Sequence, residues 1–224
     1  MEKQEGTAMN LKRVIIWILG VNILAAGIVL NTKTGLGCAA VSSVNYVASR
    51  LFPVSFGTAS SILYLIFVGI QIVLLKKITI AIAMQIPFSI LFGWLTDLYD
   101  RALQVEPHTL GAQMIVLLIA ISLTALGIHL FLKADIVYNP VEGLTKACAQ
   151  KMNKEIGQMK NMLDLSMMSV SLLIGLVFSG GIIGIGAGTL ISALLCGRML
   201  GLYRKMEQHL TSEAAPIRQK ADRT

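Results

Sequence analysis

The sequence predicts an all-α polytopic membrane protein of two inverted repeats, each with three transmembrane helices plus one short re-entrant or interfacial helix. The 224-residue chain is 55% hydrophobic and 14% charged, against about 25% charged residues in a soluble domain. It also contains several apolar runs that approach the roughly 20 residues needed to cross a bilayer. Finally, its residue order recurs after about 100 positions, and such long duplications are frequent in transporter folds.

The duplication is visible as identities at two fixed spacings. At 100 positions the identical pairs include Ala25 and Ala125, Gly27 and Gly127, Lys33 and Lys133, and Gly57 and Gly157. At 104 positions they include Ala83 and Ala187, Leu91 and Leu195, Gly93 and Gly197, and Tyr99 and Tyr203. A small insertion near residues 179–181 accounts for the four additional positions.

Six apolar runs are expected to cross the bilayer, at residues 11–30, 57–75, 78–98, 112–132, 162–178 and 182–202. The first run follows Lys12 and Arg13, as in a signal peptide, but it is long and no A-x-A site follows it, so we expect it to be retained. The expected organisation is a tail at 1–10, repeat one at 11–101, an external loop at 102–111, repeat two at 112–205 and a cytoplasmic tail at 206–224.

A more polar segment lies between the first two spans of each repeat, at residues 38–52 and 140–152. Both segments are expected to be amphipathic helices, because apolar residues recur on one face. The first stripe is Val41, Val44, Ala48 and Phe52, and the second is Val141, Leu144, Cys148 and Met152. Such helices either re-enter the membrane, lie flat on it or cross it.

Charge favours the arrangement in which the short helices do not cross. With six spans, Lys12, Lys76, Lys151 and Arg198 all face the cytoplasm, whereas eight spans would place Lys76 outside. Three spans per repeat also turn the second copy upside down. We therefore expect a membrane protein with both termini in the cytoplasm. The net charge of +7 is then an orientation signal, and no nucleic-acid partner is expected.

The N-termini of the two short helices are the first candidate binding positions. Free N–H groups and the positive end of the helix dipole lie there, and broken helices in transporters bind anionic groups in this way. The residues concerned are Gly37 in repeat one, and Tyr138, Asn139 and Pro140 in repeat two. If the helices lie flat on the membrane instead, these positions have no such role.

Three charged residues of repeat two complete the candidate site. Glu142, in the first turn of the second short helix, either stabilises the helix dipole or contacts a substrate or ion. Lys160 and Asp164 are four positions apart and share a helix face, so they can pair. Asp164 lies in an apolar span, where an ionised group is costly without a partner. A purely structural pair remains the alternative. Other polar residues within spans, including Gln71 and Gln85, are expected to join helices.

The remaining residues exclude several classes of site. Cys38, Cys148 and Cys196 lack metal-type spacing, and the three histidines are isolated. The chain has no P-loop, catalytic triad or dinucleotide fingerprint. We therefore expect no metal, no cofactor and no enzymatic activity.

Several motifs resemble those of the bacterial YczE/YyaS/YitT-type integral membrane proteins, a poorly characterised family. The matching stretches include Gln85-Ile86-Pro87-Phe88-Ser89, Lys133-Ala134-Asp135, Pro140-Val141-Glu142-Gly143, Lys160 and Asp164-Leu165-Ser166. The chain departs from the pattern at Cys38-Ala39-Ala40 and at Gly186-Ala187, where relatives often carry charged residues. The resemblance implies a location in the bacterial inner membrane and a membrane architecture, and it implies these more firmly than an activity.

These features favour a permease for a small polar or anionic solute, working by alternating access between the two repeats. The alternative is a membrane-embedded partner or substrate-capture subunit of an energised complex, or a passive channel. Besides the lipid bilayer, the partners left open are a homo-oligomer and an energising complex. Because the two copies differ at Pro140, Glu142, Lys160 and Asp164, the site is expected mainly in repeat two.

Overall fold

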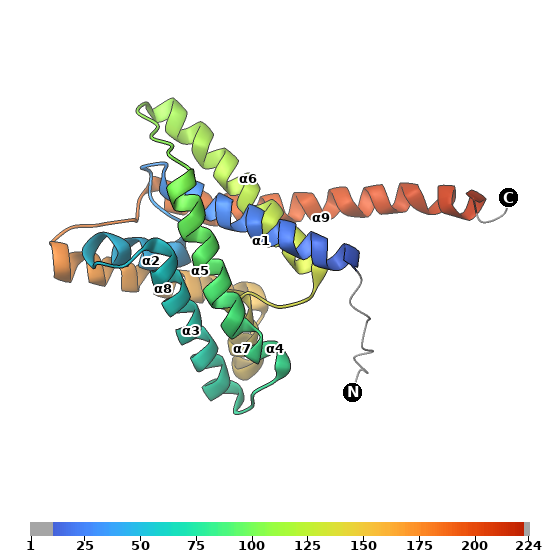
Figure 1. Ribbon diagram of the computed structural model, residues 1–224, viewed down its shortest axis with the longest axis horizontal. Helices are drawn as coiled ribbons and strands as arrows, with labels where there is room; N and C mark the ends of the chain where they lie inside the picture. Colours follow the sequence, from blue (N-terminus) through green and yellow to red (C-terminus); the bar gives the residue numbers. More distant parts are fainter. Residues whose placement is uncertain (1–10, 222–224) are drawn as a thin grey trace.

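The computed structural model describes the backbone of residues 11–221 and the side chains up to residue 209, and this part of the chain is all-helical (Figure 1). The helices are α1 (Leu11–Thr32), α2 (Ala40–Leu51), α3 (Phe56–Leu75), α4 (Ile80–Ala83), α5 (Gln85–Ala102), α6 (Leu110–Ala134), α7 (Pro140–Met152), α8 (Ile156–Ser179) and α9 (Ala187–Ala221). The expected tail at 1–10 and the last three residues of the expected tail at 206–224 lie outside the described residues.

Within the described residues, five helical segments are long and apolar enough to span a membrane: α1, α3, α4 with α5, α6 and α8. They correspond to the first five predicted runs. The sixth run differs, because residues 180–186 are not helical and α9 begins only at Ala187. Gly180 and Gly184 have φ angles of 69° and 77°, a left-handed conformation that ends a helix and that glycine adopts without strain. Arg198 and Arg204 also make α9 less apolar than the other five.

Helices α1 and α6 pack closely and run antiparallel at the centre of the molecule (Figure 1). A methyl group added to Gly27 would lie 2.6 Å from Thr124 N, and one added to Gly127 would lie 2.5 Å from Leu24 N. Residue numbers thus rise along one helix as they fall along the other. The glycines allow the two backbones to approach this closely, as is common between membrane helices.

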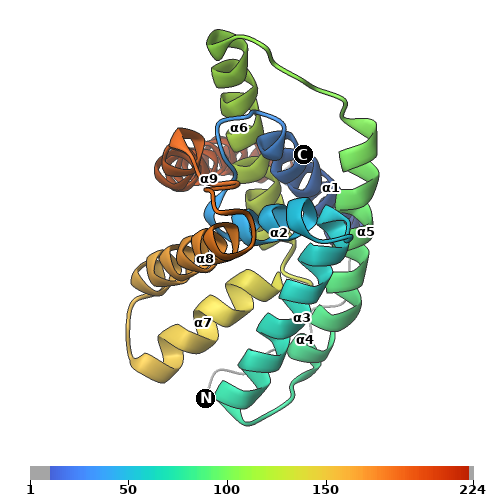
Figure 2. The ribbon, with the colours of Figure 1, turned by 90° about the vertical axis from the view of Figure 1, so that its left-hand side faces the viewer.

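The predicted short helices α2 and α7 are present, and both pack against α3 and α8 (Figure 2). The predicted face of α2 is partly wrong. Ser43 and Asn45 are buried, and Phe52 is exposed. The polar groups are satisfied locally, because Ser43 Oγ donates to Ala40 O over 2.7 Å and Asn45 Nδ2 donates to Ser60 Oγ over 2.9 Å. A helix enclosed on two sides can bury polar residues when they are bonded in this way.

Helix α7 buries its predicted apolar face in the first two turns but not at its end. Val141 and Leu144 are buried in the aromatic core, whereas Met152 is exposed. The core stacks Tyr64 on Phe92 with ring centroids 5.6 Å apart, and Phe88 lies 5.7 Å from Phe92. This core joins α3, α5 and α6, so it fixes where α7 begins.

The last two long helices of the two halves of the chain are arranged differently. Helix α3 packs along α5, whereas α8 forms no comparable contact with α9. Figures 1 and 2 show α9 leaving the body beside α6, away from α8. Only 11% of the apolar window of α8 is buried, against 33% to 44% for the other four candidate spans.

Candidate functional site

The start of α7 is built as a capped helix N-terminus. Asn139 Oδ1 accepts a hydrogen bond from Val141 N over 3.0 Å, and Pro140 occupies the first turn, where its missing N–H costs nothing. Both residues are buried. Since Asn139 already binds one of the free N–H groups, this helix end is less open to an anionic group than the sequence suggested.

Two buried glutamines hold the start of α7 against α3 and α5. Gln71 and Gln85 are 1% and 2% exposed, and their side-chain amides bond to each other. Gln71 Nε2 also donates to Pro140 O over 3.3 Å. A methyl group added to Gly143 would lie 2.5 Å from Gln71 Oε1, so this glycine lets α7 come close. The prediction that these glutamines join helices is confirmed.

Lys160 and Asp164 form an ion pair on α8, and Glu142 of α7 lies within electrostatic range of it without forming an ion pair of its own in the described part of the chain. Lys160 Nζ lies 3.5 Å from Asp164 Oδ1, with side chains 42% and 24% exposed. The Glu142 carboxylate interacts electrostatically with Lys160, and Cys196 of α9 lies within range of all three charges. Glu142 Oε2 is buried without a hydrogen-bond partner among the described residues. We call Asn139, Glu142, Lys160 and Asp164 the α7–α8 cluster.

Tyr64 borders the α7–α8 cluster, and the sequence analysis did not select it. Its side chain is buried on α3, close to the Asn139 side chain and within electrostatic range of Glu142. Its position in the duplication, 100 residues before Asp164, is the one signal that pointed to it. The apolar residues around it in the sequence otherwise suggest only a residue of the hydrophobic core.

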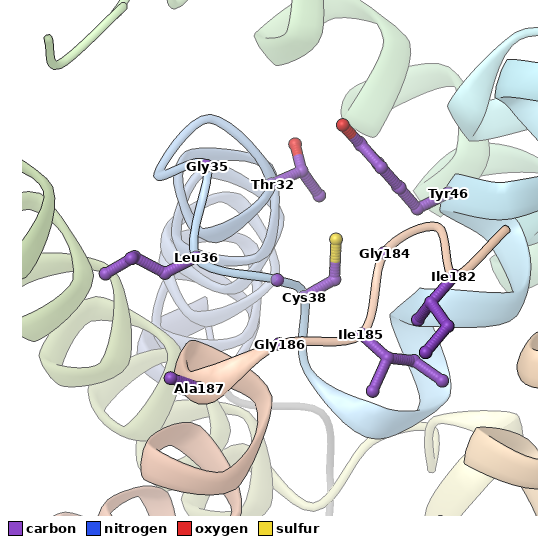
Figure 3. Close-up of a pocket in the computed structure, with 11 residues that line it drawn as sticks. Thr32, Gly35, Leu36, Cys38, Tyr46, Ile182, Gly184, Ile185, Gly186 and Ala187 are labelled. Carbon is purple, nitrogen blue, oxygen red and sulfur yellow. The ribbon is translucent and has the colours of Figure 1, made fainter.

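Gly37 does not join the α7–α8 cluster. It lines a separate cavity of about 330 Å³ between the α1–α2 junction and the loop before α9, with Cys38, Tyr46 and Gly186 around it (Figure 3). With a φ angle of 102°, Gly37 approaches so closely that an added methyl group would lie 2.5 Å from Gly186 N. Cys38 N donates to the loop at Gly184 O over 2.8 Å. Burial raises the pKa of the Cys38 thiol to about 12, so it is protonated at neutral pH.

Tyr138 also makes its contacts away from the cluster. Its hydroxyl donates to Asp135 Oδ1 over 2.8 Å, and Lys146 Nζ lies 3.6 Å from the centre of its ring. Both partners are exposed. The hydrogen bond to the Asp135 carboxylate raises the pKa of Tyr138 above its usual value. These contacts tie the α6–α7 connection to α7.

The predicted site is therefore divided. Asn139, Pro140, Glu142, Lys160 and Asp164 meet at the start of α7, whereas Gly37 and Tyr138 lie elsewhere. The cluster offers two carboxylates and one ammonium group between helices. Within the described residues, no group of three or more His, Cys, Asp or Glu side chains is placed to hold a metal ion.

Comparison with known proteins places the chain by its family alone. None of the curated proteins and none of the solved structures compared with it matches. A family of unknown function, DUF6198, matches residues 11–205, which include every helix from α1 to α8 and the first half of α9. The chain belongs to this family of unknown function, DUF6198.

Proposed function

We propose that the protein is a permease for a small polar solute that binds at the α7–α8 cluster. The observation that carries the proposal is that the Lys160–Asp164 pair and, within electrostatic range of it, Glu142 lie on helices packed against membrane-length segments. The buried Glu142 Oε2 has no hydrogen-bond partner among the described residues, and a buried unpaired acceptor is costly. A solute that donates a hydrogen bond to it relieves that cost. Such a solute suits the site better than a purely anionic one.

Reciprocal contacts between the two halves support inverted repeats. Gly27 meets Thr124 while Gly127 meets Leu24, so the two contacts exchange under a shift of 100 residues. Helices α2 and α8 likewise pack together as α7 and α3 do. Such exchange is the signature of a two-fold axis. Because α1 and α6 are antiparallel, the axis lies in the membrane plane if both helices cross it, which is the arrangement of inverted-repeat transporters.

The proposal is tested with purified protein and with the protein in liposomes. Metabolite pools are screened for a shift of the melting temperature, and a hit is then followed by uptake. We expect Asp164→Asn to abolish both the shift and the uptake. Asp100→Asn is the matched control, because Asp100 also pairs with a lysine, Lys33, at 2.6 Å but in the other repeat.

Three outcomes separate the possibilities. Uptake that saturates and depends on Asp164 supports a permease. Uptake that rises linearly with concentration points to a channel instead. A hit that binds equally well to Asp164→Asn and wild type removes Asp164 from the site.

A second candidate function is a membrane subunit of an energised complex. It is favoured by the basic outer face of α7, where Lys146, Lys151 and, just beyond the helix, Lys154 are exposed. Co-purification from native membranes of an ATPase in fixed stoichiometry would favour this role over a permease that works alone. Triple substitution of these lysines by glutamine should then release the partner.

A further inference from the structure

Helices α3 and α5 of repeat one cross at two glycines. A methyl group added to Gly57 would collide with Gly93 O, and one added to Gly93 would lie 2.5 Å from Gly57 O. The crossing is extended by Ser61 Oγ, which donates to Ser89 O over 3.0 Å. Repeat one is thus closed along this pair of helices.

The same positions in repeat two are open. Gly157 and Gly197 are the counterparts of Gly57 and Gly93, and a methyl group added to either would meet nothing within 4 Å. Their helices, α8 and α9, do not pack along each other as α3 and α5 do (Figure 2). The glycines that permit a close crossing are present, but the crossing is not made.

Helix α9 nevertheless occupies the position that repeat one predicts for it. Tyr99 on α5 donates to Asn22 on α1 over 3.1 Å, and its counterpart Tyr203 on α9 donates over 3.5 Å to the backbone of Ser122 on α6, the counterpart of Asn22. Each repeat also pairs the lysine near the end of its first helix with a carboxylate of its last helix. Helix α8 also keeps its template contacts with α2 and α7, so what is missing from repeat two is the contact between α8 and α9.

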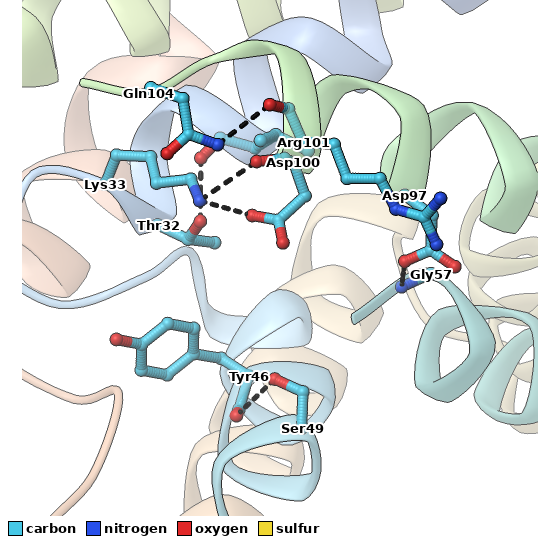
Figure 4. A network of polar contacts seen from close by, with 10 residues as sticks. Thr32, Lys33, Tyr46, Ser49, Gly57, Asp97, Asp100, Arg101 and Gln104 are labelled. Atoms are coloured by element: carbon cyan, nitrogen blue, oxygen red, sulfur yellow. Dashed lines mark hydrogen bonds and ion pairs between the residues drawn. The ribbon is translucent and has the colours of Figure 1, made fainter. Parts of the chain in front are cut away.

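A carboxylate explains why repeat one is the closed half. Asp97 on α5 accepts from Gly57 N over 2.7 Å (Figure 4). It also accepts from Ser55 Oγ over 2.6 Å, so it fastens the start of α3. The counterpart of Asp97 in repeat two is Gly201, which has no side chain to make this contact. Hydrogen bonds to a charged group are among the stronger ones, so closure of repeat two lacks a stabilising contact that repeat one has.

We propose that α8 closes against α9 in a second conformation, with Gly157 meeting Gly197, and that this closure occludes the α7–α8 cluster. The proposal rests on the permease function proposed above. It uses the contact geometry that the chain already adopts in repeat one. Glu155, at the start of α8, would then lie beside Gly201 and between Arg198 and Lys205, one turn to either side. None of these charges has an ion-pair partner among the described residues.

Closure has a consequence for the charge that a bound solute should carry. In repeat one Tyr64 stacks on Phe92, and their counterparts in repeat two are Asp164 and Cys196. Closing α8 therefore buries Asp164 against α9. Glu142, Lys160 and Asp164 together carry one excess negative charge, and burying an uncompensated charge is costly. A solute that brings a positively charged group to the cluster removes this excess and favours the closed form.

The test is disulfide formation between matched pairs in a variant without native cysteines. The test pair is Asn161→Cys with Ala193→Cys, whose side chains are both exposed. Its repeat-one counterpart, Ser61→Cys with Ser89→Cys, is the control, since these residues are already in contact. Disulfides form only when the two Cα atoms come within about 7 Å. Membrane vesicles are oxidised at fixed pH, and the product is followed by gel mobility after cleavage between the repeats.

We expect both pairs to form an intramolecular disulfide, the control pair faster. Absence of the test disulfide while the control forms would overturn the proposal. A disulfide between two chains would also overturn it, because a second copy would then cover α8. Gly157→Cys with Gly197→Cys is the backup pair if the first one fails to fold. The assay measures closure without any solute, so a failure here leaves the permease function standing.

Charge variants test whether the excess negative charge of the cluster opposes closure. Glu142→Gln removes the excess negative charge and should speed the disulfide by about threefold to tenfold, whereas Lys160→Gln increases the excess and should slow it by a similar factor. Control-pair rates should be unchanged in both variants. If the test disulfide forms at the same rate with the unsubstituted cluster, with Glu142→Gln and with Lys160→Gln, the requirement for a positively charged solute is overturned.

Discussion

Gln71 and Gln85 bind each other through both atoms of their side-chain amides. Gln71 Nε2 donates to Gln85 Oε1 over 2.9 Å, and Gln85 Nε2 donates back to Gln71 Oε1 over 3.2 Å. The pair joins α3 to α5 and presents Gln71 Nε2 to Pro140 O, at the start of α7. The reciprocal hydrogen bonds between these two glutamines of repeat one therefore help to position the start of α7, which carries part of the α7–α8 cluster.

The first prediction concerns this amide pair. Gln71→Leu leaves the buried Gln85 amide without its partner and removes the side-chain bond to Pro140 O, so we expect a loss of about 1–3 kcal/mol of stability. Gln104→Leu is the control, because Gln104 is exposed and bonds only to Arg101 O in its own turn. The melting temperature in detergent measures the stability of both variants. The double variant Gln71→Leu with Gln85→Leu should lose less than the sum of the single variants, and strict additivity would contradict the paired geometry.

The second prediction concerns the close approach of α7. Gly143→Ala places a methyl group 2.5 Å from Gln71 Oε1 and 2.8 Å from Gln85 Nε2, so we expect overpacking to cost about 1–3 kcal/mol. Gly69→Ala is the control. It also lies inside a helix, but a methyl group there meets nothing within 4 Å, and alanine is the better helix former. Equal melting temperatures for the two variants would argue against the contact.

Local chemistry explains how much of this architecture was predictable. Apolar length is a property of each segment alone, so five spans and both short helices follow from the sequence. The Lys160–Asp164 pair is also local, and it is found. The Asn139 cap is local too, but Asn139 was predicted from the sequence to bind substrate. The position of Gly37 apart from the α7–α8 cluster could not be predicted, because its neighbour Gly186 lies 149 residues away and no local pattern reports that contact. The late start of α9 depends on the loop at residues 180–186, which is held by bonds to the α1–α2 junction.

The third prediction is a pH dependence at the end of α6. Lys133 and His129 both bind Glu207, and the hydrogen bond and charge of Lys133 lower the pKa of this carboxyl below its usual 4.5. A lowered pKa in the folded state means that the contribution to stability is present above the unfolded pKa and is lost as the pH falls through the folded one. We therefore expect Glu207→Gln to melt slightly lower than wild type at pH 7, by less than about 1 kcal/mol for so exposed a pair. The difference should shrink below pH 4.5. A difference that grows on acidification would contradict this assignment.

The fourth prediction concerns orientation. In a cysteine-free variant, Lys151→Cys at the exposed end of α7 should react with a membrane-impermeant maleimide only in inside-out vesicles. His108→Cys, in the loop between α5 and α6, should react only in right-side-out vesicles or intact cells. The reason is the bias of lysine and arginine toward the cytoplasmic side. Labelling of both positions from the same side would exclude the six-span inverted arrangement.

The fifth prediction concerns the carboxylate that fastens repeat one. Asp97→Asn replaces a charged acceptor that binds both Gly57 N and Ser55 Oγ, and each bond to a charged group contributes about 1.5–3 kcal/mol. Since the site is partly exposed, we expect a loss near the lower end of this range, together with slower disulfide formation between Ser61→Cys and Ser89→Cys. Asp100→Asn, one turn further along α5 and paired with Lys33 instead, should leave that disulfide unchanged. If both variants slow it equally, general loosening of α5 is the cause, and Asp97 does not hold α3 and α5 together.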